Sequence, residues 1–316
     1  MQTITMDPQL RKEFFSDKEN SRGIPVYPLL LAVSGHRHIE PKSLEIVRKN
    51  TAEFLLETGS FWYHKQTSDQ KEISPASILV LCGMAAGADQ LVAEEVLRLK
   101  KEKPELSYKL TAALPMPKKI YEKDFSEGAE RLQFLQLLDE ADYTIEIPLT
   151  NEGQAWLDTH PGESLPSKHR MPQYEKLGQY LAANSLYLLA LWDGMEIERI
   201  KMDSTGKKTG EIFTNDPIKP DSRGGTADVV RMKMEADLSD NAMPAALAGF
   251  PKLMEFSADL PVGSVFHIAT PRVKKGFVQL AKDLTPGEFK IYEPYKNLSK
   301  QDSDSLSERN RANQNP

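Results

Sequence analysis

The sequence predicts an α/β fold: a Rossmann-like, doubly wound and mostly parallel sheet with two loop insertions. Two observations lead to this prediction. Short apolar runs alternate with helical segments along the chain, and three turns that contain glycine precede predicted helices. Alternating strands and helices are typical of a parallel sheet covered by helices on both faces. Ligands of such sheets bind beyond the carboxyl ends of the strands, where these turns would gather.

Each predicted element follows from the local pattern of apolar residues. The predicted strands are the apolar runs at residues 25–33, 77–82, 108–115, 142–147, 186–192 and 263–269. The predicted helices lie at residues 42–66, 88–102, 126–140 and 173–185, and a further helix follows the turn at residues 222–228. Helical spacing of apolar residues supports the first of these helices, which has Pro41 near its first turn.

The elements predict one domain at residues 25–295. Residues 1–24 are polar and mixed in charge, and we expect a flexible lead-in there. Residues 296–316 contain almost no apolar side chain, a composition typical of a disordered tail or a linker. Two polar stretches, at residues 149–172 and 196–222, are predicted as long loops on the ligand side of the sheet. They would form either lids or plain surface loops.

Composition excludes several classes of protein. The 316 residues are 40% hydrophobic and 27% charged, as in an ordinary globular protein. No apolar run reaches the roughly 18 residues of a membrane span, and the polar N-terminus is no signal peptide. The lone cysteine, Cys82, excludes an internal disulfide and favours a cytoplasmic protein. The net charge of −6 argues against general nucleic-acid binding, so any anion site must be local.

Three turns carry the candidate binding residues. The second predicted strand ends in Gly83-Met84-Ala85-Ala86-Gly87-Ala88-Asp89, where backbone N–H groups and a helix dipole favour phosphate. The first ends in Ser34-Gly35-His36-Arg37, whose guanidinium can fork onto a phosphate. The third turn, Arg223-Gly224-Gly225-Thr226-Ala227-Asp228, adds a hydroxyl. The candidate ligand-binding residues are Ser34, Gly35, Arg37, Gly83, Met84, Gly87, Asp89, Pro115, Tyr121, Arg223, Gly224, Gly225, Thr226 and Asp228.

Single residues in these turns have alternative roles. Asp89 would either bond a ribose hydroxyl or base edge, or cap the following helix. Tyr121 would either stack on a base or pack as a partly buried loop aromatic. Cys82 is expected to be a small buried residue, because no basic neighbour would activate its thiol. The histidines show no zinc-binding spacing, and we expect no metal.

The order of these motifs resembles the SLOG superfamily over about residues 28–272. The resemblance rests on Ser34-Gly35-His36-Arg37, residues 83–89, Ala113-Leu114-Pro115, Leu189-Ala190-Leu191-Trp192-Asp193-Gly194 and Gly224-Gly225-Thr226-Ala227-Asp228. This Rossmann-like superfamily includes DNA-uptake proteins, cytokinin-activating phosphoribohydrolases and nucleotide-sensing domains of bacterial anti-phage systems.

The chain departs from the hydrolase branch at one residue. That branch has the pattern Gly-Gly-x-Gly-Thr-x-x-Glu with a catalytic glutamate, whereas this chain has Val229 there and Asp228 one position early. Cleavage of an N-glycosidic bond would then lack its carboxylate. Acidic net charge argues against the DNA-binding branch. The resemblance therefore implies the sensor branch, with a pocket for a cyclic nucleotide, an ADP-ribose derivative or a nucleoside monophosphate.

We expect a nucleotide or second-messenger sensor of a bacterial defence or signalling system. It would need no cofactor, would form a homo-oligomer, and would contact an effector domain or protein through its C-terminal tail. The alternative is a nucleoside-monophosphate phosphoribohydrolase or ribosyltransferase, in which Glu94 or Asp228 would act with Arg37. An oligomerising scaffold without a ligand is the third possibility.

Overall fold

The computed structural model describes residues 28–67, 77–195, 200–202, 208–212, 225–235, 263–274 and 276–292. The predicted lead-in at residues 1–24 and the predicted tail at residues 296–316 lie outside the described residues.

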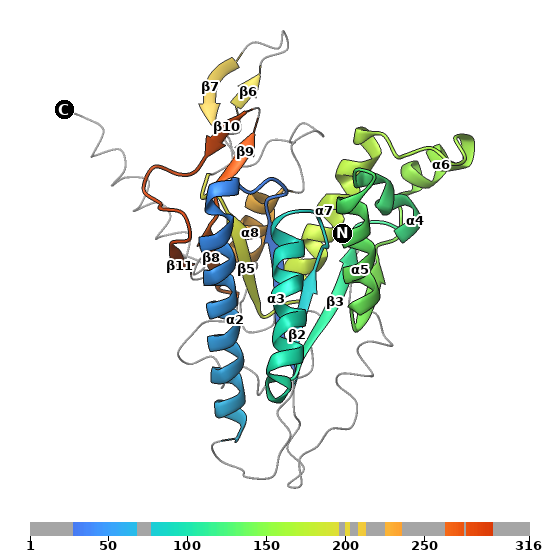
Figure 1. The fold of residues 1–316 in the computed structure, drawn as a ribbon. Helices are drawn as coiled ribbons and strands as arrows, with labels where there is room; N and C mark the ends of the chain where they lie inside the picture. Colours follow the sequence, from blue (N-terminus) through green and yellow to red (C-terminus); the bar gives the residue numbers. More distant parts are fainter. Residues whose placement is uncertain are drawn as a thin grey trace, which may run out of the picture.

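A seven-stranded sheet in the order β11-β8-β5-β1-β2-β3-β4 forms the centre of the structure (Figure 1). Its strands are β1 (Leu29–Gly35), β2 (Ile78–Cys82), β3 (Tyr108–Leu114), β4 (Tyr143–Glu146), β5 (Tyr187–Trp192), β8 (Val265–Ala269) and β11 (Phe289–Tyr292). Neighbouring strands are parallel except β11, which is antiparallel to β8. The predicted α/β fold with a mostly parallel sheet is confirmed.

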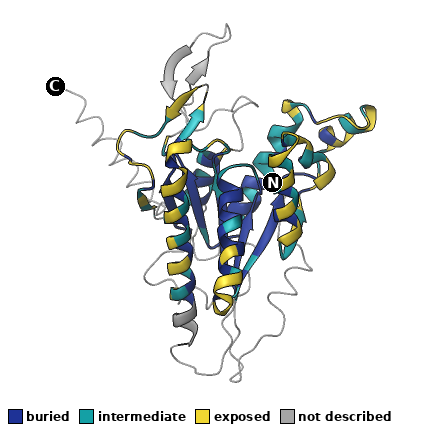
Figure 2. Cartoon of the chain, viewed as in Figure 1, coloured by how far each residue is buried: buried dark blue, intermediate teal, exposed yellow. Residues whose placement is uncertain are grey.

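The helices cover both faces of the sheet. On one face, α2 (Leu44–Thr67) and α5 (Ala129–Glu140) flank α3 (Ala88–Glu102), which packs on β1 and β3. On the other, α7 (Ser167–Ala183) and α8 (Thr226–Glu235) pack together on β1 and β5. The inner strands β1, β2, β3, β5 and β8 are mostly dark blue in Figure 2 because their apolar runs are buried between the helices, as parallel strands require, whereas the edge strands β4 and β11 are partly exposed.

The strand order reverses beside β1. From β1 the chain adds β2, β3 and β4 in one direction, and then places β5 on the opposite side of β1. Such a switch point leaves a crevice at the carboxyl ends of the two strands, because their connections leave in opposite directions. The described residues after β1 and β5 therefore mark the expected place of a ligand.

The prediction of a loop at residues 149–172 is wrong. This stretch contains α6 (Asn151–Thr159) and the start of α7. The hydroxyl of Thr150 caps α6 by accepting a hydrogen bond from the N–H of Gly153 at 3.0 Å. Pro172 lies inside α7, which is long enough to tolerate the one backbone hydrogen bond that proline removes.

Several short elements lie outside the sheet or were not predicted. Short helical turns occur at η1 (Pro41–Ser43), η2 (Pro104–Leu106), α4 (Lys118–Tyr121) and η3 (Glu122–Asp124). Two antiparallel pairs are β6 (Ile200–Met202) with β7 (Lys208–Ile212), and β9 (Arg272–Lys274) with β10 (Phe277–Gln279). Neither pair was expected from the sequence, and neither was β11. The β6–β7 pair lies in the second predicted insertion.

A buried lysine fixes α8 against α7. The ammonium of Lys233, on α8, donates hydrogen bonds to the carbonyls of Ala182 and Ser185, at and just beyond the C-terminal end of α7. Burial lowers the pKa of Lys233 to about 7. The carbonyls at a helix C-terminus are otherwise unsatisfied, so this contact helps to hold α8 and its N-terminus in place.

Gly87 allows α3 to begin close to the end of β1. It has a φ of +87°, and a Cβ added there would lie 2.2 Å from the carbonyl oxygen of Arg37. The N–H of Ala88 donates to the carbonyl of His36 at 3.0 Å. The start of α3 therefore touches the chain segment that carries Arg37.

A matched pair of glycines tests this close approach. Gly87 and Gly128 both precede a helix with positive φ, but a Cβ on Gly128 would meet nothing within 4 Å. We expect Gly87→Ala to lower the free energy of unfolding by about 1–3 kcal/mol more than Gly128→Ala, because only the first adds a clash to the backbone strain. Urea unfolding of both variants measures the difference, and equal losses would contradict the packing described.

Candidate functional site

A cavity of about 670 Å³ lies at the switch point. It is lined by residues 33–38 at the end of β1, the glycine turn after β2, one side of α7, the first turn of α8, and the β9–β10 pair. In Figure 1 this region is the upper end of the sheet, with α4 and α6 at the right and β9 and β10 above β5 and β8.

The structure brings most of the predicted site residues together. Those that line the cavity are Ser34, Gly35, Arg37, Gly83, Asp89, Tyr121, Gly225 and Thr226. Those that do not line it are Met84, Gly87, Pro115 and Asp228. Arg223 and Gly224 lie outside the described residues. The described parts of the three predicted turns therefore meet at this cavity.

The predicted residues outside the cavity lining have structural positions. Met84 is fully buried with a φ of +59°, and Gly87 allows the close approach described above. The carbonyl of Pro115 accepts a hydrogen bond from the side chain of Gln173 at 2.8 Å. Asp228 is buried and forms an ion pair with Arg231 at 3.0 Å.

Arg37 is held in place by an aromatic ring and a carboxylate. Its Nη2 donates to the hydroxyl of Tyr174 at 2.7 Å, and its Cζ lies 5.2 Å from the centre of that ring. The Tyr174 hydroxyl donates in turn to Asp124, which also pairs with Arg170 at 2.7 Å. Burial opposes the charge of Arg37, but the Tyr174, Tyr121 and Asp124 side chains raise its pKa above the ordinary value. The guanidinium therefore stays charged in a fixed position.

Asp89 presents a carboxyl oxygen without a partner. Its Oδ2 accepts a hydrogen bond from the N–H of Ala85 at 3.3 Å, while its buried Oδ1 has no hydrogen-bond partner among the described residues. Burial raises the pKa of Asp89 to about 7, although the Ala85 N–H, the charge of Arg37 and the nearby Gly35 N–H act in the opposite direction. Near neutral pH this group can donate or accept a hydrogen bond in the cavity.

Tyr121 packs among other aromatic residues. Its ring is fully buried, and it makes edge contacts with Phe125, Phe134 and Tyr174. Its hydroxyl donates to the carbonyl of Gly83 at 3.2 Å. These contacts pack the ring into the wall of the cavity, and Tyr121 is fully buried at the end of α4 rather than partly buried in a loop.

His36 and Asp193 join the ends of β1 and β5. The Nε2 of His36 lies 3.0 Å from the backbone N of Asp193 and 3.2 Å from its Oδ1. The backbone N–H can only donate, so Nε2 accepts and the ring is neutral. Burial lowers the pKa of His36 more than the contact with Asp193 raises it, in agreement with a neutral ring.

Asp193 also holds Arg272. The Oδ2 of Asp193 lies 2.6 Å from the Nε of Arg272, an ion pair whose angle falls outside the hydrogen-bond range. Burial would raise the pKa of Asp193, but its polar contacts, among them the Met195 N–H and the charge of Arg272, hold that pKa below its usual range. An ionised Asp193 thus keeps Arg272 at the cavity wall.

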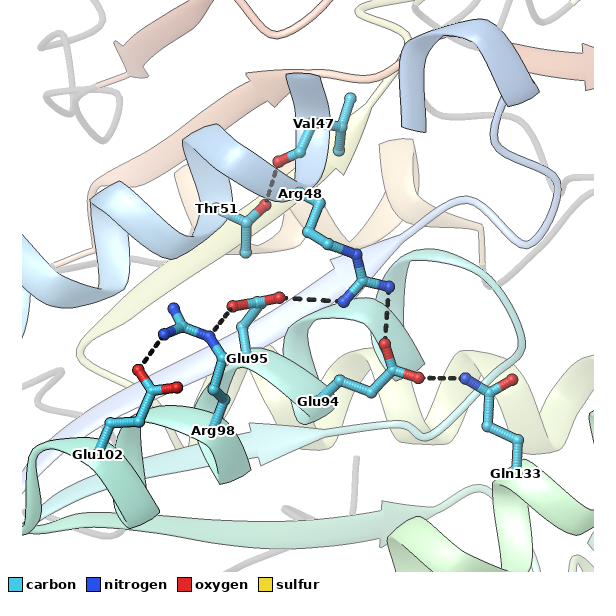
Figure 3. A network of polar contacts seen from close by, with 8 residues as sticks. All are labelled: Val47, Arg48, Thr51, Glu94, Glu95, Arg98, Glu102 and Gln133. Atoms are coloured by element: carbon cyan, nitrogen blue, oxygen red, sulfur yellow. Dashed lines mark hydrogen bonds and ion pairs between the residues drawn. The ribbon is translucent and has the colours of Figure 1, made fainter. Parts of the chain in front are cut away.

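Glu94, a candidate for catalysis, lies away from the cavity. Figure 3 shows it on α3, paired with Arg48 of α2 at 2.7 Å and bonded by Gln133 of α5. Arg48 also pairs with Glu95 at 3.0 Å, and Glu95 with Arg98 at 2.8 Å. This network joins α2, α3 and α5, with Glu95 buried among them.

Replacing Glu94 separates the structural from the catalytic role. Because both Glu94 and Arg48 are partly exposed, we expect Glu94→Gln to lower the free energy of unfolding by at most about 1 kcal/mol. We also expect unchanged ligand binding, since Glu94 does not line the cavity. Urea unfolding and ligand titration of this variant measure both quantities. Loss of binding without loss of stability would place Glu94 in the functional site after all.

The charges at the cavity favour an anion. Its described lining includes the cationic side chains of Arg37, Arg272 and Lys274, and Asp89 as the one carboxylic acid. Gly225, Thr226 and Ala227 bring the N-terminus of α8 to the same space. Backbone N–H groups at a helix N-terminus and its dipole add partial positive charge. The site is therefore locally positive in a chain whose net charge is −6.

Other kinds of site find no support in the described part of the chain. It contains no group of three or more His, Cys, Asp or Glu side chains that could hold a metal ion. None of its helices combines the length and the apolar character that crossing a membrane requires. Cys82 is buried, donates to the carbonyl of Asp89 at 3.2 Å, and has a pKa raised by burial. It is the small buried residue that was expected.

Several lining residues were not predicted as site residues from the sequence, among them His36, Tyr174, Arg272 and Lys274. His36 lies inside a predicted turn, so its position was available as a signal. Tyr174 lies on α7 among other polar residues, and nothing local distinguishes it from an exposed tyrosine. Arg272 and Lys274 follow the last predicted strand, which the switch-point rule alone would have placed near the ligand.

The sequence matches no protein-family model and no curated protein.

Proposed function

We propose that the cavity binds a phosphorylated nucleotide-type ligand and that the protein acts as a sensor of that ligand. The observation that carries this proposal is the local charge of the cavity. Three cationic side chains and a helix N-terminus line the cavity together with a single carboxylic acid, although the whole chain is acidic. A volume of about 670 Å³ is within the range of small-molecule sites and suits a nucleotide.

Several groups have the chemistry that recognition of a nucleotide requires. Arg37 is fixed by Tyr174 and would fork onto a phosphate without first losing side-chain freedom. Ser34 and Thr226 offer hydroxyls at the cavity wall. The unpartnered Oδ1 of Asp89 would bond a hydroxyl or amino group of the ligand, such as those of a ribose or a base.

Recognition is favoured over hydrolysis by the placement of the carboxylates. Val229 lines the cavity at the position of the glutamate in the hydrolase pattern, whereas Asp228 pairs with Arg231. Glu94 is engaged with Arg48 outside the cavity. Asp89 alone would have to stabilise an oxocarbenium-like transition state, a reaction for which glycosidases commonly use two carboxyl groups. The likeness to the SLOG sensor branch supports the same proposal, including a role in defence or signalling.

Thermal unfolding in the presence of nucleotides tests the proposal. The panel contains mono-, di- and cyclic nucleotides of the four bases, cyclic dinucleotides and ADP-ribose derivatives. A ligand that binds only the folded state stabilises it and so raises the melting temperature. At a ligand concentration of 100 times the dissociation constant, the stabilisation is about 2.7 kcal/mol. We expect at least one phosphorylated member to do so, and none of the unphosphorylated nucleosides.

The same panel distinguishes the sensor from the enzyme. Each stabilising nucleotide is incubated with the protein and the mixture is analysed for free base by chromatography. The sensor proposal requires the nucleotide to remain intact. Release of base that is lost in Asp89→Asn would replace it with the hydrolase alternative, and a panel without any stabilising member would refute both.

A further inference from the structure

We infer that the cavity has two separate anion-binding poles, one at Arg37 and one at Arg272 and Lys274, and that its ligand is a nucleotide with two phosphate groups. The inference rests on the proposed function and narrows its ligand class. The second pole lies on the β9–β10 pair, which no sequence motif predicted.

The second pole is a built site rather than a surface loop. The β9 strand is tied to the segment after β1, because the N–H of Val273 donates to His38 at 2.9 Å and the N–H of Glu40 donates to Pro271 at 2.9 Å. Arg272 forms an isolated bridge with Ile39. The position of the Arg272 backbone is thus fixed to the end of the central strand.

Each arginine has its own positioning carboxylate. Arg37 is attached through Tyr174 to Asp124, which belongs to η3. Arg272 contacts Asp193, which follows β5 on the other side of the switch point. Each pairing uses part of a guanidinium that has five donors. The ion pair with Asp193 uses the Nε of Arg272, which leaves its two Nη groups for an anion.

The two poles lie on different sides of the β1 terminus. His36 and Arg37 are consecutive residues, yet His36 contacts Asp193 at the end of β5 while Arg37 contacts Tyr174 on α7. Arg272 shares Asp193 with His36 and therefore lies on the His36 side. A single phosphate that is bound by Arg37 would leave the Arg272 side without its anion.

The second pole also carries a polar group for a ligand. Lys274 is exposed and lines the cavity, and Gln279 is the register partner of Arg272 in the β9–β10 pair. The Oε1 of Gln279 is buried without a hydrogen-bond partner among the described residues. It would accept from a hydroxyl or amino group of the ligand, as Asp89 would near the first pole. Two phosphates with hydroxyl or amino donors between them describe a dinucleotide, in which sugars separate the phosphates, rather than a nucleoside diphosphate, whose phosphates are joined directly.

Calorimetric titration of arginine variants tests the two poles. The probes are the 5′-monophosphate, the 5′-diphosphate, the ADP-ribose-type conjugate and the cyclic dinucleotide of the base that the nucleotide panel identifies. We expect at least one probe with two phosphates to bind more tightly than the monophosphate. Arg272→Gln should weaken that probe by about 10- to 100-fold, the loss expected for charge-assisted hydrogen bonds, and change monophosphate binding by less than about twofold.

Control variants separate binding from folding. Arg131→Gln removes an arginine that does not line the cavity, and Lys274→Gln removes an exposed pole residue without leaving a buried charge unpaired. Lys274→Gln should weaken the same probe by a smaller factor than Arg272→Gln, and Arg131→Gln should have no effect. Arg272→Lys keeps a cation beside Asp193. Compared with Arg272→Gln, it should therefore recover more of the stability of the parent protein than of its affinity for the probe.

The outcomes distinguish this inference from the proposed function. If no nucleotide stabilises the protein, the proposed function fails, and this inference with it. If the monophosphate binds as tightly as every probe with two phosphates, or if Arg272→Gln and Lys274→Gln both behave like Arg131→Gln, the protein binds a nucleotide but the second pole does not exist. If Arg272→Gln weakened the mono- and two-phosphate probes equally, both arginines would bind the same phosphate. That result would also overturn the inference.

Discussion

Replacing Arg37 with alanine is expected to lower the affinity for the phosphorylated ligand by about 100-fold or more. Charge-assisted hydrogen bonds contribute about 1.5–3 kcal/mol each, and a guanidinium that forks onto phosphate makes two of them. Arg37 is already fixed by Tyr174, so little entropy is lost when it binds. Calorimetric titration with the strongest stabiliser of the nucleotide panel measures the loss.

Two milder variants at the same place sharpen the result. Arg37→Lys keeps the charge without the fork and should retain part of the affinity. Tyr174→Phe keeps the ring against the guanidinium but removes the hydroxyl that links Arg37 to Asp124, so it should weaken binding less than Arg37→Ala. If Arg37→Ala binds as tightly as the parent protein while its fold is intact, the anion site is not where we propose it.

Replacing Asp89 with asparagine is expected to stabilise the protein above pH 7 by up to about 4 kcal/mol. The folded pKa of about 7 lies about three units above the ordinary value of 3.8, and each unit is worth about 1.4 kcal/mol. Between these values the folded state keeps a proton that the unfolded state has lost. Stability is therefore lost as the pH rises from about 4 to about 7, and the full cost remains at higher pH.

Urea unfolding at several pH values measures the size and the sign of the change in the free energy of unfolding. Asp89→Asn should match the parent protein near pH 4 and exceed it at pH 8. Asp142→Asn is the control of opposite sign. Burial would raise the pKa of Asp142, but its contacts with Lys100 and Lys109 hold that pKa below its usual range. Asp142→Asn should therefore cost stability at pH 8 and little at low pH. If the stability of both variants, relative to the parent protein, changed with pH in the same direction, the environment described for Asp89 would be contradicted.

Asp89 should also make ligand binding depend on pH. An ionised Asp89 would face the phosphates of a bound nucleotide, so the affinity should fall as the pH rises through about 7. Asp89→Asn cannot ionise and should bind with a flatter pH profile. Calorimetric titration at pH 6 and pH 8 compares the two proteins, and a parent protein without any such fall would argue against contact between Asp89 and the ligand.

The elements of the sheet that the sequence predicted are those with the strongest local pattern. The apolar runs at 78–82 and 187–192 are continuous because parallel strands are buried on both faces. The glycine turns were found because a close backbone approach, as at Gly87, leaves no room for a Cβ. Their convergence followed from the general behaviour of parallel sheets rather than from any single residue.

The predictions that were wrong or incomplete also have specific physical causes. Residues 151–159 contain Gly153 and lie beside prolines, a composition that suggests a loop, but the cap by Thr150 is local chemistry that outweighs it. Tyr174 and Arg272 become site residues only through partners distant in sequence, Arg37 and Asp193. No local pattern encodes such contacts. Asp228 was considered for catalysis from its spacing, whereas the turn of α8 directs Val229 to the cavity.

The placement of β1 has a consequence for how the protein folds. This strand precedes all the other described elements, yet it lies in the middle of the sheet and pairs with β2 on one side and with the much later β5 on the other. During synthesis it can pair on one edge as soon as β2 exists, but its second edge stays open until residues 187–192 have emerged. Contacts of such long sequence separation form slowly. The binding cavity, which needs β5, α8 and β9 as well, is therefore expected to be among the last parts of the molecule to form.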